Sequence, residues 1–141
     1  MLCVKTKVLP SKIHGLGLFA DQFIKSGTLV WRFLAGFDQR FTHEQVATFP
    51  EMVQKYLAKH ASFREGGLYL LCADEGNYFN HSRTPNVQSV KQDGETEMPV
   101  YSLKDISQGE ELTENYSEYD KVGDESNLLR GIIKRYKLPD F

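Results

Sequence analysis

Short apolar runs that end at a turn residue constrain the fold of this chain more than any other feature of its sequence. Runs rich in β-branched and aromatic residues fill the first 40 residues and residues 68–116, and glycine, proline or asparagine ends each one after a few positions. Residues 4–8 alternate between apolar and polar, and residues 28–33 form a second candidate strand. Asp93 and Gly94 lie between two such runs and predict a hairpin. The sequence therefore predicts a mainly β fold with short strands.

The central part of the chain predicts a helix instead. Thr42 and Gln45 have the spacing of a capping box, in which each side chain bonds to the backbone of the other residue. Pro50 fits the first turn of the helix that follows. Four apolar residues fall on one face of that helix, namely Met52, Val53, Tyr56 and Leu57.

A second helix is predicted near the C-terminus. Five residues with apolar or aromatic side chains repeat there at helical spacing, namely Leu128, Leu129, Ile132, Ile133 and Tyr136. Asp124 or Ser126 would cap this helix, and Pro139 would stop it. We expect it to pack one face on the β body. Its basic side fits a solvated helix face, so we assign that side no partner.

Two segments of seven residues, 24–30 and 106–112, have a similar pattern. Each places a glycine between polar residues and then enters an apolar stretch. Glycine reaches backbone conformations that other residues avoid, so each segment predicts a glycine turn that leads into a strand. Two copies of this length are too few for a repeat architecture.

Length, charge and cysteine content exclude several classes of protein. A chain of 141 residues with 40% hydrophobic residues predicts a single domain over residues 1–141. The net charge of −2 disfavours general nucleic-acid binding, which needs a broad basic surface. The longest apolar run, residues 68–73, is too short to cross a membrane, and the first residues do not resemble a signal peptide. We expect a soluble protein in the cytoplasm or another intracellular compartment, the nucleus only if the source is eukaryotic. The two cysteines and four histidines have no metal-ligand spacing, so no metal is expected.

Three segments hold residue types that carry chemistry, although each alone is typical of a loop or a solvated face. Residues 15–20 bring Gly15 and Gly17 close together, so the backbone could bend there and approach a ligand. Residues 77–86 combine three asparagines, a histidine, a serine and an arginine with two aromatic residues. Residues 105–120 carry six acidic residues and no lysine or arginine. That stretch fits either a solvated acidic face or a surface that attracts cationic peptides.

Taken in order, these segments resemble the SET-domain family of protein-lysine methyltransferases. The family's G-x-G motif, followed by an aromatic residue and alanine, is similar to residues 15–20. Residues 80–86 match its N-H-S-x-x-P-N motif in full, and residues 109–116 match G-E-E-L-T-x-x-Y. The resemblance covers about residues 5–119, and its compactness is similar to that of small bacterial and viral members. It implies a β-clip-like fold of small curved sheets, in which the strand end around residues 113–116 crosses the segment after Asn80 as a pseudoknot.

The resemblance also implies a function and a site. The function is S-adenosylmethionine-dependent methylation of a lysine in a basic peptide or protein, such as a histone-like tail. Tyr116 is the expected catalytic residue, which would orient the amine and the methyl group. The residues expected to bind the cofactor are His14, Gly15, Leu16, Gly17, Asn80, His81, Tyr116 and Tyr119. The residues expected to contact the substrate are Leu34, Glu114 and Glu118.

The chain departs from the family pattern at several positions. No cysteine follows Cys72, so the zinc segment that closes the channel in many members is not expected, and Tyr119 with the helical segment 120–141 would close it instead. Leu34 replaces a tyrosine, and Glu114 stands where an aromatic residue often helps determine how many methyl groups are added. Residues 77–79 replace the common R-F-I. These departures leave open a non-catalytic SET module that binds cofactor or protein, whereas the retained Asn80, His81 and Tyr116 favour an enzyme.

Overall fold

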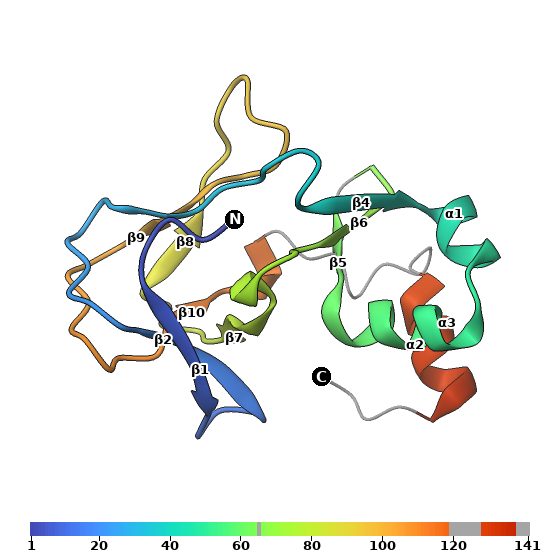
Figure 1. Ribbon diagram of the computed structural model, residues 1–141, viewed down its shortest axis with the longest axis horizontal. Helices are drawn as coiled ribbons and strands as arrows, with labels where there is room; N and C mark the ends of the chain where they lie inside the picture. The colour runs from blue at the N-terminus through green and yellow to red at the C-terminus, as the bar shows by residue number, and fades with distance from the viewer. Residues whose placement is uncertain (65, 119–127, 138–141) are drawn as a thin grey trace.

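The chain folds into two adjoining parts, which Figure 1 shows side by side. The computed structural model describes residues 1–64, 66–118 and 128–137, apart from the side chain of Glu118. The first, which we call the β part, contains β1 (Thr6–Pro10), β2 (Leu16–Ala20), β3 (Leu29–Trp31), β7 (Asn80–His81), β8 (Val87–Ser89), β9 (Val100–Ser102) and β10 (Thr113–Glu114). The second, which we call the helical part, contains β4 (Gln39–Thr42), α1 (His43–Thr48), α2 (Glu51–His60), β5 (Ser62–Arg64), β6 (Leu68–Leu71) and α3 (Leu128–Tyr136). Two short 3₁₀ turns, η1 (Glu75–Tyr78) and η2 (Tyr116–Glu118), flank β7 and β10.

The strands form four small sheets, as a mainly β fold with short strands requires. The β part holds the antiparallel pair β1–β2, the antiparallel sheet β3–β9–β8 and the parallel pair β7–β10. The helical part holds the antiparallel sheet β4–β6–β5. The predicted hairpin is confirmed, because β8 and β9 are neighbouring antiparallel strands and Gly94 in the turn between them has a φ of 83°. Among the described residues, no helix has the length and apolar character needed to cross a membrane.

The two similar segments seen in the sequence pair with each other. Ile24 and Ile106 each donate a backbone hydrogen bond to the other, at N···O distances of 2.9 and 2.8 Å, and both side chains lie in the core of the β part. Gly27 and Gly109 have φ angles of 80° and 88°, which only glycine adopts without strain. The prediction of two glycine turns is therefore confirmed.

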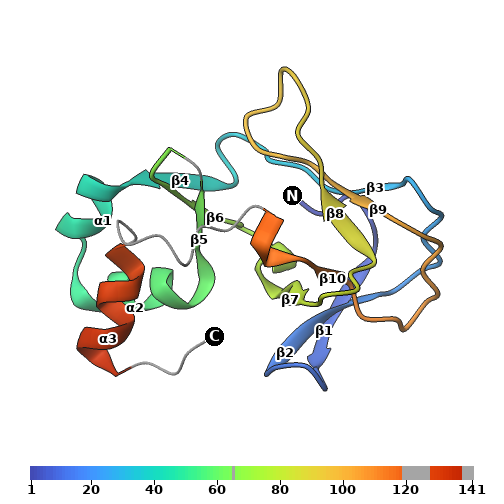
Figure 2. The same ribbon diagram turned by 180° about the vertical axis from the view of Figure 1, so that it is seen from behind.

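The parallel pair β7–β10 is the crossing that the resemblance implied, and Figure 2 shows the two strands side by side. Thr113 lies opposite Asn80, and Glu114 lies opposite His81. Asn86 fixes the crossing from the other side, since its Oδ1 accepts from the backbone N–H of Thr113 at 2.8 Å. The backbone N–H of Asn86 donates to the Thr113 carbonyl oxygen at 3.2 Å. Residues about 30 positions apart in sequence are thus held in one short ladder.

The helical part confirms the predicted cap, and on α2 it buries only part of the predicted apolar face. Both hydrogen bonds of the capping box between Thr42 and Gln45 are present at the start of α1. On α2, however, Leu57 is buried, whereas Met52 and Tyr56 are 74% and 51% exposed. The reason is that Leu57 faces a second core inside the helical part, which the side chains of α1, β5, β6 and α3 also form.

The C-terminal helix α3 fills one side of this second core. Leu129 and Ile132 are buried in it, and α3 packs against α2. The backbone N–H of Leu128 donates to the Tyr69 hydroxyl at 2.9 Å, which joins the start of α3 to β6. The sequence predicted packing on the β body, whereas the apolar face of α3 packs inside the helical part. The predicted caps at Asp124 and Ser126 and the stop at Pro139 lie outside the described residues.

This packing predicts unequal effects of two apolar truncations. Ile132→Ala empties a site that is 2% exposed and should lower the free energy of unfolding by about 2 to 5 kcal/mol. Met52→Ala removes a side chain that is 74% exposed and should change it by less than about 0.5 kcal/mol. Urea denaturation of both variants measures the difference. Equal destabilisation would contradict the assignment of the two faces.

Candidate functional site

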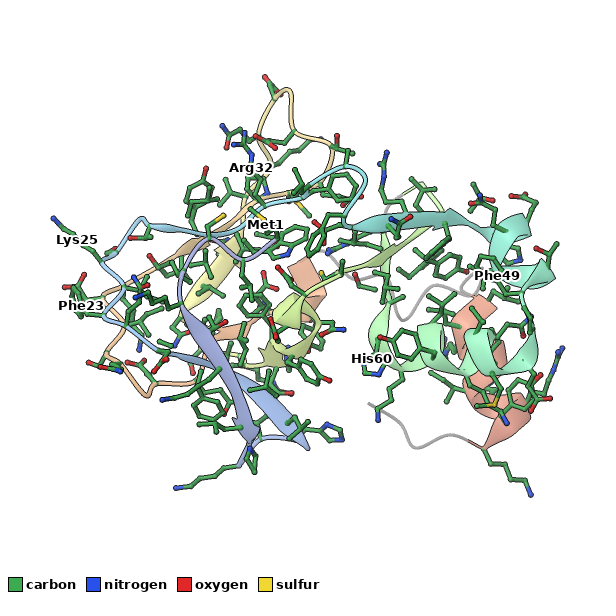
Figure 3. All side chains as sticks on the ribbon, in the orientation of Figure 1. Met1, Phe23, Lys25, Arg32, Phe49 and His60 are labelled. Carbon is green, nitrogen blue, oxygen red and sulfur yellow. The ribbon has the colours of Figure 1, made fainter. Side chains whose placement is uncertain are left out.

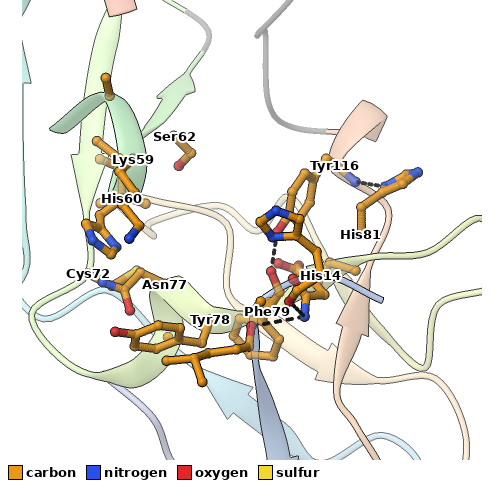
Figure 4. A pocket seen from close by; sticks show the side chains of 18 of the residues that line it. His14, Lys59, His60, Ser62, Cys72, Asn77, Tyr78, Phe79, His81 and Tyr116 are labelled. Atoms are coloured by element: carbon orange, nitrogen blue, oxygen red, sulfur yellow. Dashed lines mark hydrogen bonds between the residues drawn. The ribbon is translucent and has the colours of Figure 1, made fainter. Parts of the chain in front are cut away.

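A pocket of about 1150 Å³ lies between the β part and the helical part, and all three segments that the sequence analysis singled out reach it. Gly15 and Leu16 come from the first segment, with His14 directly before it, and residues 77–81 come from the second. Glu114, Tyr116 and Ser117 come from the third. Figure 4 shows His14, His81 and Tyr116 on one side of the pocket, with Lys59, His60 and Ser62 on the other.

Asn80 joins these segments through a single side-chain amide. Its Nδ2 lies 3.2 Å from the His14 carbonyl oxygen, 3.1 Å from that of Leu16 and 2.8 Å from Oε1 of Glu111. The residue is only 8% exposed, so these bonds replace the water that the amide would otherwise need. The loop at residues 14–16 therefore takes its shape from Asn80, which the crossing of β7 and β10 holds in place.

Glu111 completes this arrangement and explains the second glycine of the G-x-G motif. Its carboxylate accepts from the Ser11 hydroxyl at 2.8 and 3.0 Å as well as from Asn80. A Cβ atom on Gly17 would lie 2.2 Å from Glu111 Oε1, so no other residue fits without moving that carboxylate. Gly17 itself is buried and is not among the residues that line the pocket. Gly17 is therefore needed for close packing against Glu111. Gly15 lines the pocket, and its φ of 45° lets the loop turn there.

Tyr116 lies over His81 and Phe79 at the end of β10. Its backbone N–H donates to Nδ1 of His81 at 3.2 Å, and the two ring centroids are 5.4 Å apart. Its hydroxyl donates to the Phe79 carbonyl oxygen. These contacts hold the phenol ring at the pocket wall with its hydroxyl against the backbone of the N-H-S segment.

The opposite wall holds polar side chains that the sequence analysis did not select. Figure 3 shows His60 on the side of the helical part that faces the β part. Burial, with a smaller effect from the charge of Lys59, lowers the pKa of His60, which favours a neutral imidazole. Burial, with a smaller effect from Asp38, raises the pKa of the Cys72 thiol to about 12, so this pocket residue stays protonated at neutral pH and is a poor nucleophile.

Two further polar groups in the pocket wall lack hydrogen-bond partners among the described residues. They are the indole N–H of Trp31 and the side-chain oxygen of Asn77. Trp31 is 3% exposed, so its donor is out of reach of bulk water. No local sequence pattern could have identified Trp31, because β3 and η1 meet only in the folded chain.

Four described carboxylates of the acidic stretch, residues 105–120, have hydrogen-bond partners, and two of them, Asp105 and Glu110, are also accessible to solvent. Glu111 is bound as described above, and Glu110 accepts from Asn86 at 3.2 Å. Glu114 is 4% exposed, and its Oε1 accepts from the Ser89 hydroxyl at 2.9 Å. Glu114, the buried one of these carboxylates, thus has a hydrogen bond of the kind that a buried polar group needs.

The remaining predicted site residues lie elsewhere or outside the described structure. Leu34 is 45% exposed, its N–H donates to Asp38 Oδ2 at 2.8 Å, and it is not among the residues that line the pocket. Tyr119 and the side chain of Glu118 lie outside the described residues. Within the described residues, no three His, Cys, Asp or Glu side chains are placed to hold a metal ion. The expectation of a zinc-free protein stays a prediction.

Comparison with known families identifies this arrangement. The pattern of the SET domain matches residues 15–117, which include the pocket loop, the β7–β10 crossing and Tyr116. The chain therefore belongs to the SET-domain family.

Relatives and solved structures agree with this assignment. The histone-lysine N-methyltransferase, H3 lysine-4 specific, of Aspergillus oryzae is 30% identical over 120 residues, or 75% of this chain, and the Schizosaccharomyces pombe protein of that description is 30% identical over 124 residues, or 80%. This chain spans 9% and 13% of the length of those two relatives. Two structures of Polycomb Repressive Complex 2 share the fold. A humanized Chaetomium thermophilum mutant with a bound inhibitor has a TM-score of 0.65 at 20% identity, over 90% of this chain and 16% of that one. The complex called ctPRC2, autoinhibited and bound to S-adenosylmethionine, has the same TM-score and identity, over 95% and 17%.

The contact between Gly17 and Glu111 predicts opposite effects of one substitution at two glycines. Gly17→Ala forces the Glu111 carboxylate away from Asn80 and should lower the free energy of unfolding by about 1 to 3 kcal/mol. Gly131→Ala in α3 meets nothing within 4 Å and should raise it by about 0.5 to 1 kcal/mol. Urea denaturation tests both variants, and an unchanged Gly17→Ala midpoint would show that the carboxylate moves freely.

Proposed function

We propose that this chain is an S-adenosylmethionine-dependent protein-lysine N-methyltransferase. The observation that carries the proposal is the meeting of the three motif segments at one pocket through Asn80, Glu111 and Tyr116. The family supports the reaction class, and the relatives that are named histone-lysine N-methyltransferases support a lysine in a protein as the substrate. A histone-like tail is the proposed kind of target.

The pocket fits a cofactor of this size and chemistry. Its volume of about 1150 Å³ lies somewhat above the usual range for small-molecule sites, so it has room for a ligand of this size. A Cβ atom at Gly15 would meet nothing within 4 Å, so the backbone at residues 14–16 leaves open space for a ligand. The unpartnered Trp31 N–H and Asn77 oxygen offer one donor and one acceptor in the wall. When bound, S-adenosylmethionine supplies an electrophilic methyl group on a positively charged sulfur.

Each side chain at the pocket has a proposed role toward cofactor or substrate. The backbone of residues 14–16, with Asn80 and His81, would hold the cofactor, and Tyr119 would add to this site. Tyr116 would orient the target amine, because contacts with Phe79 and His81 already fix its ring. Alignment of the reacting groups is the main source of rate that a protein can contribute to such a displacement.

A non-catalytic SET module is the second candidate, and Leu34 together with Glu114 favours it because both depart from the family pattern. Calorimetry with S-adenosylmethionine tests cofactor binding, which both candidates share. Methyl transfer from labelled cofactor to histones and to a lysine peptide, with the labelled residue identified by mass spectrometry, separates them. Cofactor binding without any labelled lysine would favour the module.

Tyr116→Phe should lower the rate of methyl transfer at least about tenfold and leave cofactor affinity nearly unchanged, since the hydroxyl acts mainly in the transition state. Tyr101→Phe is the matched control, because the Tyr101 hydroxyl bonds to Gln92 in the β8–β9 hairpin and Tyr101 does not line the pocket. Single-turnover rates and calorimetry on both variants give the comparison. A fully active Tyr116→Phe enzyme would remove Tyr116 from its assigned role.

Preference for basic residues beside the target lysine stays a prediction, and the charges of the pocket give a reason to test its opposite. Of the acidic residues that motivated it, Glu111 and Glu114 accept hydrogen bonds from Asn80 and Ser89, and Glu110 pairs with Lys104 at the surface. The described lining carries one acidic residue, Glu114, and four basic residues, namely Lys59, Arg64, Arg130 and Lys134.

The two alternatives differ in sign, since a basic pocket lining would give neutral or acidic flanks the lower KM at low salt, and salt would reduce the difference. Three peptides that differ only in the charge beside one lysine measure this effect. A lower KM for the basic peptide would instead support the preference expected from the sequence.

A further inference from the structure

The positive charges of the pocket lie on one wall only. The described lining holds four basic residues, and all of them belong to the helical part: Lys59 to α2, Arg64 to β5, and Arg130 and Lys134 to α3. The wall that the β part forms contributes no lysine or arginine among the described lining residues. An anionic group of a ligand would therefore be attracted to the helical wall.

Lys59 lies beside a half-buried polar side chain on this wall. Figure 4 shows it next to His60, on the side of the pocket opposite Tyr116. Burial and, to a smaller extent, the charge of Lys59 lower the pKa of His60, so that charge reaches the imidazole. Lys59 forms no ion pair with any residue that the structure describes, whereas Arg64 faces the Glu97 carboxylate at 3.8 Å. The ammonium group of Lys59 is thus open to an anionic partner.

Tyr78 brings a hydroxyl to the same end of the pocket. Its ring centroid lies 6.2 Å from that of His60 at an interplanar angle of 72°, an edge contact between η1 and α2. Tyr78 is half-buried, and its hydroxyl has no hydrogen-bond partner within the described part of the chain. Asn77 precedes it, and the buried side-chain oxygen of Asn77 also lacks a partner there. This end of the pocket therefore combines a cation, a hydroxyl and an acceptor.

We propose that Lys59 and the Tyr78 hydroxyl bind the carboxylate at the amino-acid end of the cofactor. This inference rests on the proposed function, because it takes S-adenosylmethionine as the ligand. A carboxylate accepts several hydrogen bonds, and a bond from a charged donor is stronger than a neutral one. Lys59 would thus determine the orientation of the cofactor, with its anionic group at the helical wall.

The amino-acid end of the cofactor fits this end of the pocket better than an acidic side chain of the substrate does. That end carries a carboxylate and an ammonium group on one carbon atom. The carboxylate needs donors, which Lys59 and Tyr78 offer, and the ammonium group needs an acceptor, which Asn77 offers. An acidic side chain has no ammonium group and would leave the Asn77 oxygen without a partner.

Calorimetry with S-adenosylmethionine and with its decarboxylated analogue tests the carboxylate contact without turnover. The analogue keeps the rest of the cofactor and lacks only the carboxylate. Wild type should bind S-adenosylmethionine at least about tenfold more tightly than the analogue, and Lys59→Met should lower this preference at least about fivefold. A preference in Lys59→Met equal to that of wild type would overturn the proposal.

Lys134→Met is the matched control, because it removes one positive charge from the same wall of the pocket. The analogue carries one more net positive charge than S-adenosylmethionine, so loss of any nearby cation favours the analogue at long range. This long-range effect is screened by salt, whereas a direct contact is screened much less. At about 0.15 M salt we expect Lys134→Met to change the preference less than about twofold. A change as large as that of Lys59→Met would overturn the direct contact.

Tyr78→Phe tests the second donor. The substitution keeps the ring that contacts His60 and removes only the hydroxyl. The preference for S-adenosylmethionine over the analogue should fall roughly two- to fivefold. An unchanged preference would remove Tyr78 from the carboxylate contact.

Three outcomes separate this inference from the proposed function. If wild type binds S-adenosylmethionine and every variant keeps the wild-type preference, only the inference fails. If wild type binds neither ligand, the proposed function fails, and the inference fails with it. A peptide with one lysine between acidic residues is the third probe. If Lys59→Met weakens binding of this peptide but keeps the preference between the two cofactor ligands, the anionic partner belongs to the substrate, and the assignment to the cofactor is overturned.

Discussion

The side-chain amide of Asn80 and the carboxylate of Glu111 form the contact on which the rest of the site depends. Asn80 reaches the carbonyls of His14 and Leu16, and Glu111 reaches Ser11 at the start of the same loop. Both are held by the parallel pairing of β7 and β10, which brings residues about 30 positions apart together. The loop closes through its own bond from the Ser11 N–H to the Gly15 carbonyl at 2.9 Å, and the two side chains fix where it lies against β7. The three motifs therefore build one site only when all three are present in the folded chain.

Local features of this fold could be predicted from the sequence, because their causes lie within a few residues. The Thr42 cap, the turn at Gly94 and the glycine turns at Gly27 and Gly109 all follow from conformational preferences of single residues or short patterns. The exposed face of α2 could not be predicted in this way. Helical spacing identifies which residues share a face, but the second core of the helical part decides whether that face is buried.

The same distinction applies to the site. The resemblance indicated Asn80, His81 and Tyr116, and the structure brings all three to the pocket. It could not indicate Trp31 or His60, because the first belongs to a core strand and the second to the end of a helix in the other part. These residues reach the pocket only through the packing of α2 and β3 around it. Sequence motifs describe one wall of this pocket, and tertiary packing supplies the other.

Two glutamates of the third motif, Glu111 and Glu114, have different surroundings in the folded chain. Glu111 and Glu114 are three residues apart and look equivalent in an acidic stretch. Glu111 lies beside Gly17 and bonds to Asn80 and Ser11, so its charge supports the loop. Glu114 bonds to Ser89 and borders the pocket, where four of the five described charged residues in the lining are basic. Two carboxylates three residues apart therefore differ in role, because the fold places one against Gly17 and the other in the pocket wall.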